Sequence, residues 1–294
     1  MKRRTFLLSA ALGCLCLLYP DSVSAIFPSK KRGSTAYSFI HLSDPQFGMF
    51  GAFEKHDSFE KETVLMQKAV DAVNRLKPKY VLVTGDLVND RNNEAQIKEY
   101  KRFISLIDKK IPVYDIPGNH DVGNDALAAD VERYKEIFGS DRFSFGYKNT
   151  YVIGINTNLI WAGNAALEAE QTKWLKEELK KGHKYKFRIV AGHHPIYIEK
   201  PNEEKRYENF PLAKRSEYLN LFLDNHVDMY LSGHLHYPAG DSSAGVPLCT
   251  AGAVGYPIRG KSGINIVSVT SDGVKAKFFD FDNLPQSIDK GIIL

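Results

Sequence analysis

Five short clusters of acidic, amide and histidine residues recur along the chain, and their side chains can bind metal ions. The clusters read Asp44-Pro45-Gln46, Gly85-Asp86, Gly118-Asn119-His120-Asp121, Gly192-His193-His194 and Gly233-His234-Leu235-His236. Together they offer the seven oxygen and nitrogen ligands that two adjacent divalent ions need, with a further histidine for acid chemistry. Carboxylate, imidazole and amide groups without thiolate suit Mn, Fe or Zn.

Asp86 is the predicted bridge between the two ions, because a carboxylate has two oxygens and Gly85 lets the backbone approach closely. Two ions ~4 Å apart can share a hydroxide and clamp a phosphoryl oxygen. Metal binding also lowers the pKa of water toward ~7. His234 and His236 are two residues apart, so in an extended segment they point the same way and can bind different ions.

Each cluster follows an apolar run that predicts a buried strand, and strand ends can bring distant ligands together. These strands are predicted over residues 37–42, 80–83, 111–116, 187–191 and 227–231. Helical spacing predicts helices over 59–76, 94–107, 126–138, 167–179 and 212–223, a hairpin over 143–155, and final strands at 246–250, 264–270 and 274–279. The alternation predicts one α/β domain over residues 36–294, with two packed sheets and helices outside.

Residues 1–25 are predicted to be a signal peptide. A basic start at residues 2–4 precedes an apolar stretch over 6–19 and small residues at 22–25. The start resembles a twin-arginine export signal. Alternatively, the residues before Cys14 resemble a lipoprotein box, which would place a lipid anchor on Cys14. We therefore expect an exported protein, periplasmic or secreted, with a lipoprotein as the alternative.

Composition excludes several other classes. The net charge of the 294 residues is +4, and the predicted signal peptide carries about half of it, which is too little for a nucleic-acid patch. Residues 26–35 are expected to be a linker, and no span crosses a membrane in the predicted mature chain. Of the three cysteines only Cys249 lies beyond the signal peptide, so neither an internal disulfide nor a thiolate metal site is expected.

The order of the five clusters is similar to that of the calcineurin-like metallophosphoesterase superfamily, over about residues 37–280. The resemblance implies an α/β fold, a four-layer α/β/β/α sandwich of two mixed sheets. It implies that one ion is bound by Asp44, Gln46, Asp86 and His236, and the second by Asp86, Asn119, His193 and His234. It also implies that His120 is the catalytic histidine and that Asp121 is the carboxylate that orients it.

The chain departs from the family pattern at Gln46, where the family most often has histidine. An amide oxygen is a weaker and harder ligand than imidazole, which argues against Zn at this position. The segment Asp44-Pro45-Gln46-Phe47-Gly48, with the later residues 253–256, resembles a narrower branch. That branch includes a protein serine/threonine phosphatase with a calcineurin-like domain.

The predicted function is hydrolysis of a phosphomonoester, such as a phosphorylated small molecule, by an exported metal-dependent enzyme. A metal-bridging hydroxide would attack phosphorus, while His120 donates a proton to the departing alkoxide. One alternative is a phosphodiesterase that acts on nucleotides or envelope phosphodiesters. Another is a non-catalytic interaction module, which would be expected to have lost ligands or the acid histidine.

Overall fold

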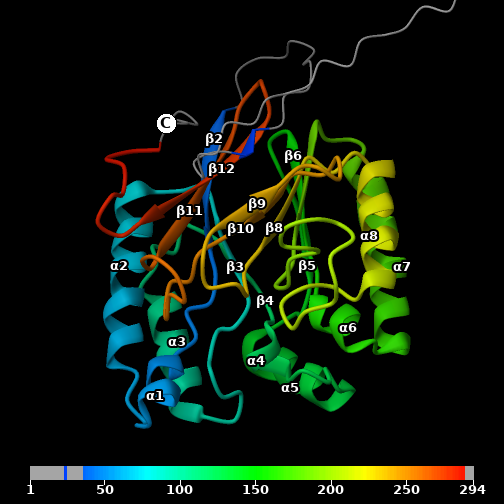
Figure 1. Ribbon diagram of the computed structural model, residues 1–294. Helices are drawn as coiled ribbons and strands as arrows, with labels where there is room; N and C mark the ends of the chain where they lie inside the picture. Colours follow the sequence, from blue (N-terminus) through cyan, green and yellow to red (C-terminus); the bar gives the residue numbers. More distant parts are fainter. Residues whose placement is uncertain (1–22, 25–35, 289–294) are drawn as a thin grey trace, which may run out of the picture.

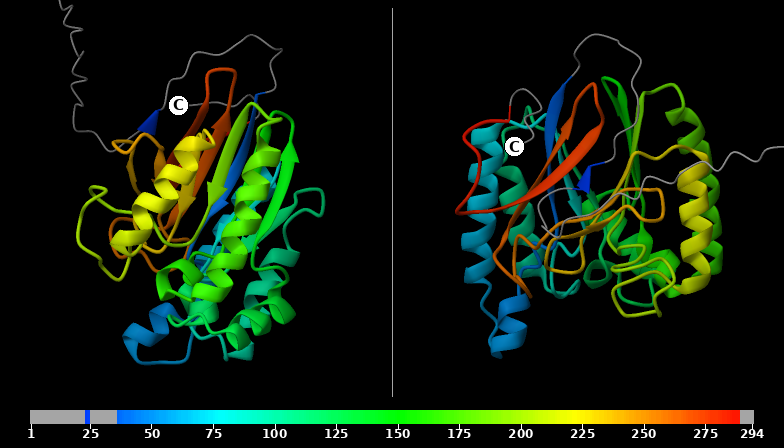
Figure 2. Two further views of the ribbon diagram at one scale, coloured as in Figure 1. Left: turned by 90° about the vertical axis from the view of Figure 1, so that its right-hand side faces the viewer. Right: turned by 45° about the horizontal axis from the view of Figure 1, so that its top comes forward.

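The computed structural model describes residues 23–24 and 36–288. Two six-stranded sheets pack face to face, and helices cover both outer faces (Figure 1; Figure 2, right). The predicted four-layer sandwich is therefore confirmed. Most of the predicted signal peptide, including Cys14, and the predicted linker lie outside the described residues.

Each sheet contains a set of neighbouring parallel strands. The first sheet has the order β1 (Val23–Ser24), β12 (Val274–Asp280), β11 (Gly263–Val269), β2 (Tyr37–Leu42), β3 (Val81–Thr84) and β4 (Val113–Ile116). The second has the order β5 (Phe143–Tyr147), β6 (Thr150–Gly154), β7 (Phe187–Ala191), β8 (Met229–Ser232), β10 (Leu248–Thr250) and β9 (Ala239–Asp241). Strands β2 to β4 are parallel in the first sheet, as are β6, β7, β8 and β10 in the second. Each parallel set therefore ends at one edge of its sheet.

The long helices cover the sheets and the shorter ones gather at one end. Helices α2 (Glu60–Leu76) and α3 (Glu94–Ser105) cover the first sheet, and α7 (Ala165–Gly182) and α8 (Leu212–Asp224) cover the second (Figure 2). The shorter helices lie at the lower end in Figure 1: α1 (Met49–Glu54), α4 (Asn119–Val122), α5 (Ala128–Phe138) and α6 (Thr157–Ala162). This is the end at which the parallel strands finish.

Three apolar clusters hold the layers together, one between the sheets and one under each helical layer. Alternation along β2 explains the division: Phe39 packs between the sheets, whereas Ile40 packs toward the helices. On β3, Leu82 packs between the sheets and Val83 toward the helices. Both faces of each sheet are thus buried, which sets the position of one sheet against the other.

The long elements lie where the sequence predicts them, with ends that differ by a few residues. Helices α1, α4 and α6 and strand β9 were not predicted, because three to six residues are too few to show a period. The free Cys249 is buried. Within residues 36–288 no helix has the length and the apolar composition to span a membrane.

The inter-sheet core offers a direct test of this architecture. Leu82 is fully buried between the sheets, so Leu82→Ala is expected to lower the free energy of unfolding of the metal-free protein by about 2–5 kcal/mol. Val64→Ala on α2 is the matched control, because Val64 is 58% exposed, and its effect should stay within about 0.5 kcal/mol. Urea unfolding measures both. Equal effects of the two substitutions would contradict the packing described here.

Candidate metal centre

The residues predicted as metal ligands lie at the carboxyl ends of strands from both sheets. Asp44 and Gln46 follow β2, Asp86 follows β3, and Asn119 begins α4 after β4. From the second sheet, His193 follows β7, and His234 and His236 follow β8. Each of the seven is at most 6% exposed. Buried polar groups in this number need partners or a bound cation.

The backbone at five of these residues is left-handed. The φ angles are +51° at Asp44, +38° at Gln46, +49° at Asp86, +70° at His234 and +57° at His236. For a residue other than glycine this conformation costs roughly 1–2 kcal/mol. Strain of this kind persists where the surrounding structure holds it in place, and it is concentrated at functional sites. Here the strained residues lie in the loops that follow β2, β3 and β8, where the predicted ligands gather.

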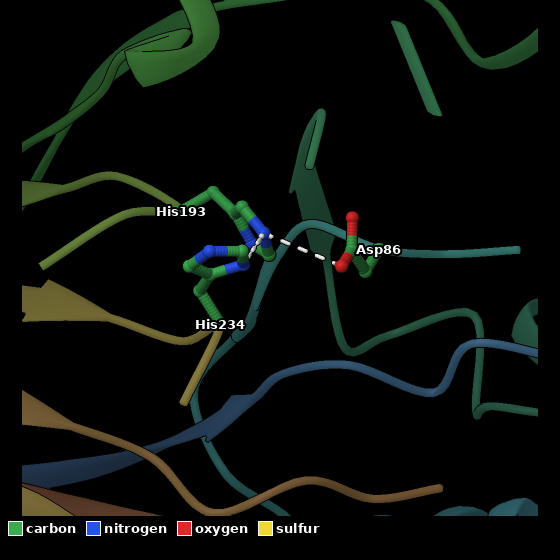
Figure 3. Close-up of side chains that lie close together, drawn as sticks. All are labelled: Asp86, His193 and His234. Carbon is green, nitrogen blue, oxygen red and sulfur yellow. Dashed lines mark hydrogen bonds and ion pairs between the residues drawn. The ribbon is translucent and has the colours of Figure 1, made fainter. Parts of the chain in front are cut away.

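Asp86, His193 and His234 form the first of two groups whose ligand atoms face one another (Figure 3). His193 Nε2 lies 3.4 Å from Asp86 Oδ2 and 3.0 Å from His234 Nδ1. Asn119 joins them, with its Oδ1 3.1 Å from the same Nε2. Three side chains, from Asp86, Asn119 and His234, thus surround Nε2 of His193.

The proton on His193 can be placed from its other nitrogen. Nδ1 lies 2.7 Å from the carbonyl oxygen of Thr84, which only accepts, so Nδ1 carries the hydrogen. In the neutral ring Nε2 then presents a lone pair to the oxygens of Asp86 and Asn119. Such lone pairs repel one another unless a proton or a metal ion lies between them. A backbone carbonyl that fixes a histidine tautomer is also a common feature of metal sites.

Asp44, Asp86 and His236 form the second group. His236 Nδ1 lies 2.5 Å from the carbonyl oxygen of Tyr256, which leaves Nε2 to face Asp44 Oδ1 at 3.6 Å. Gln46 lies two residues after Asp44 in the loop that follows β2, and its Oε1 is buried with no hydrogen-bond partner among the described residues. The backbone N–H of Gln46 donates to the carbonyl oxygen of Asp86 at 2.9 Å. An orphaned amide oxygen is, with carboxylate and imidazole, a ligand type that suits a divalent ion. Asp86 belongs to both groups.

The electrostatics show what the centre requires when it holds no metal ion. Burial lowers the pKa of His193, but the charge of Asp86 outweighs it and raises the value to about 9. Burial and the neighbouring His193 lower the pKa of His234 to about 3. Burial raises the pKa of Asp86, but His193 and His120 outweigh it and hold the value below its usual range. In the metal-free protein the positive charge of protonated His193 therefore balances the negative charge of Asp86.

His120 lies beside these groups and is oriented by the backbone. Its backbone N–H donates to Asp86 Oδ1 at 2.9 Å, and the ring nitrogen Nδ1 donates to the carbonyl oxygen of Asn89 at 2.7 Å. The ring is partly exposed. Nε2 is therefore left as the nitrogen that can exchange a proton with a bound molecule.

The contact predicted from Asp121 to His120 is corrected by the structure. The Asp121 carboxylate instead accepts from the backbone N–H groups of Leu87 at 3.0 Å and of Gly118 at 2.8 Å. Burial and the charge of Asp86 raise the pKa of Asp121 to about 7. Asp121 thus ties together the two loops that carry Asp86 and Asn119, and its side chain does not orient the imidazole.

Several contacts at the centre come from groups that the sequence does not mark. The carbonyl groups of Thr84, Asn89 and Tyr256 each hold an imidazole, and any residue type supplies a carbonyl. Gly118 carries a clearer signal. A Cβ atom at this position would lie 2.1 Å from Asp86 Oδ1, so only glycine allows the two loops to approach.

Comparison with known proteins agrees with the geometry. The model of the calcineurin-like phosphoesterase family matches residues 37–238. The human serine/threonine-protein phosphatase CPPED1 is 29% identical over 288 residues, which covers 91% of this chain and 91% of the human protein. The resemblance to the narrower branch is therefore confirmed.

Two further similarities cover less of a chain or are more distant. A probable glycerophosphodiester phosphodiesterase GpdQ from Arcobacter nitrofigilis is 30% identical over 43% of this chain and 46% of its own. The purple acid phosphatase PPD1 from yellow lupin superposes with a TM-score of 0.64 at 13% identity, over 85% of this chain and 52% of that one. The second similarity concerns the fold alone. With the family model covering most of the chain and the ligand groups gathered at the strand ends, the chain is a hydrolase of phosphoric esters that belongs to the calcineurin-like phosphoesterase family.

Proposed function

We propose that the protein is a phosphomonoesterase with two divalent ions that share Asp86. The observation that carries the proposal is the presence of Asp86 in both ligand groups. When bound, the two ions would activate a water molecule and neutralise the phosphoryl oxygens. Asp44, Gln46 and His236 would complete the first site, and Asn119, His193 and His234 the second. The orphaned oxygen of Gln46 supports its place in the first set and favours Mn or Fe over Zn there.

His120 is the proton donor of the proposed reaction. Its Nδ1 is held by the Asn89 carbonyl, and its backbone N–H is held by Asp86. The backbone contact ties His120 to a metal ligand and the Asn89 contact orients the ring, so Nε2 is kept for the oxygen of the leaving alkoxide. A general acid in this position makes a poor leaving group depart as an alcohol.

Preference for monoesters is supported by the relatives that cover most of the chain. The serine/threonine-protein phosphatases match about nine-tenths of it, and phosphorylated serine and threonine are monoesters. A phosphodiesterase is the second candidate, favoured by the partial match to GpdQ. Export also belongs to the proposal, and it rests on the basic start and apolar stretch of residues 1–25.

The proposal predicts metal content and substrate class together. Purified protein is expected to hold about two divalent ions per chain and to hydrolyse phosphomonoesters faster than phosphodiesters. Elemental analysis and a panel of both ester classes measure these properties, with Mn, Fe and Zn added back to the stripped protein. Faster turnover of diesters would favour the second candidate. Two bound ions without activity on either class would contradict both.

Removal of the proton donor should separate chemistry from metal binding. His120→Ala is expected to lower kcat by about 10²–10⁴-fold, the usual contribution of a general acid, and to leave the metal content unchanged. His183→Ala is the control, because this exposed histidine pairs with Asn225 far from the ligands. Unchanged turnover of an alkyl ester by the His120 variant would rule out this role.

The metal-free protein should lose stability as the pH rises. The folded-state pKa of His193, about 9, exceeds the unfolded value of ~6.5. Its contribution is therefore complete below pH ~6.5 and is lost as the pH rises through the folded pKa. Between pH ~6.5 and about 9 we expect the free energy of unfolding to fall, by at most about 1.4 kcal/mol per unit of the pKa shift.

Two comparisons test the cause of that loss. In the metal-loaded protein the ion replaces the proton, so the loss should disappear. The neutral variant His193→Gln should be insensitive to pH over the same range when metal-free. Urea unfolding at each pH measures these changes. A metal-free wild type whose stability rises over this range would contradict the assignment.

A further inference from the structure

One hydroxyl group reaches the ligand cluster from a loop that contributes no predicted ligand. The loop of residues 197–211 lies between β7 and α8, and it carries Tyr207. Asn119 Nδ2 donates to the Tyr207 hydroxyl at 2.7 Å. The Tyr207 ring also lies 5.1 Å from the ring of His234, between centroids. Tyr207 therefore contacts both Asn119 and His234, two of the side chains that surround His193 Nε2.

The loop is built to hold a fixed shape. The guanidinium group of Arg215, which is 1% exposed, donates to the carbonyl oxygens of Phe210 at 2.9 Å and Glu204 at 3.0 Å. The carboxylate of Glu203 accepts from the backbone N–H groups of Ile198 at 2.8 Å and Glu199 at 2.9 Å. A buried cation and a buried anion thus satisfy the backbone of the loop from inside, as is typical of compact functional loops.

Tyr207 is fixed within this loop from a second side. Trp161 Nε1 donates to the Tyr207 carbonyl oxygen at 2.8 Å, and the two rings meet edge to face at 5.8 Å between centroids. Trp161 belongs to α6, which follows β6 of the second sheet. The Tyr207 hydroxyl is therefore placed by the scaffold and does not depend on Asn119 for its position.

The Asn119 amide has two ends of nearly equal shape and opposite chemistry. Its oxygen can bind a cation, whereas its NH₂ group has no lone pair to offer. In the structure Oδ1 faces His193 Nε2 at 3.1 Å, and Nδ2 faces Tyr207 at 2.7 Å. The Tyr207 hydroxyl has a further partner, Asn124 Oδ1 at 3.4 Å, which accepts its proton. The hydroxyl oxygen is then left to accept from Nδ2, so this chain of hydrogen bonds specifies which end of the amide faces inward.

We propose that Tyr207 is a positioning residue that holds the oxygen of Asn119 toward the metal centre. The inference rests on the proposed metal centre. It makes metal affinity depend on a loop that lies outside the five ligand clusters. Loss of the hydroxyl leaves Nδ2 without its acceptor, and the amide is then free to turn its NH₂ group inward. Loss of an outer partner of a metal ligand typically lowers metal affinity by about 10–100-fold.

Titration of the metal-free protein with Mn²⁺ by calorimetry tests this inference. Tyr207→Phe keeps the ring and removes the hydroxyl, and it should weaken one of two Mn²⁺ sites by about tenfold or more. The unfolding temperature of the metal-free variant should match that of the wild type, because Tyr207 is 46% exposed. Tyr147→Phe is the matched control. It removes a hydroxyl from the aromatic cluster between the sheets, which includes Tyr37 at the start of β2 and Tyr80 just before β3. It should leave Mn²⁺ affinity unchanged.

A double-mutant cycle with Asn119→Ala separates positioning from other effects. In the Asn119→Ala background, the further change Tyr207→Phe should have no additional effect on Mn²⁺ affinity. Additive losses would overturn the inference, as would an unchanged affinity in Tyr207→Phe or an equal loss in Tyr147→Phe. A large fall in the unfolding temperature of metal-free Tyr207→Phe would also overturn it, since the hydroxyl would then be structural. Failure of the wild type to bind Mn²⁺ would instead contradict the proposed metal centre itself.

Discussion

The structure depends on one constraint: electron-pair donors from two sheets are held close enough to repel one another. Oxygen and nitrogen atoms of Asp86, Asn119 and His234 lie 3.0–3.4 Å from His193 Nε2. Without a metal ion, one proton on His193 relieves this repulsion. Five left-handed residues add backbone strain in the same loops. This arrangement therefore lowers the stability of the metal-free fold, and a bound cation would satisfy the electron-pair donors.

The two-sheet architecture explains how such an arrangement is maintained. Ligands from one sheet alone would lie along a single edge. Here the inter-sheet core sets the distance between the sheets, and polar contacts cross it at the strand ends. The Thr84 carbonyl at the end of β3 holds His193 after β7, and the Asp44 carboxylate after β2 accepts from the backbone N–H of His234 after β8. The site is thus a seam between two rigid sheets, each braced by its own helices.

Much of this could be predicted from the sequence, for physical reasons that particular residues show. Apolar runs that end in Gly85-Asp86 or Gly233-His234 mark both a buried strand and its functional end, so the fold and the gathering of candidate ligands follow together. His120 and Asp121 mark the limit. The family resemblance implies a paired acid and carboxylate, but the Asp121 carboxylate accepts from backbone N–H groups, and the carbonyl of Asn89 orients His120. Backbone acceptors carry no residue-type signal, and the position of Tyr207 depends on a long-range loop conformation.

The proposed function depends above all on Asp86 bridging two ions. Anomalous diffraction from crystals grown with Mn²⁺ measures this directly. We expect two Mn peaks about 3.5–4 Å apart. The Asp86 carboxylate should contact both ions, whereas His236 should contact one ion and His193 the other. A single peak, or two peaks of which only one contacts Asp86, would contradict the account.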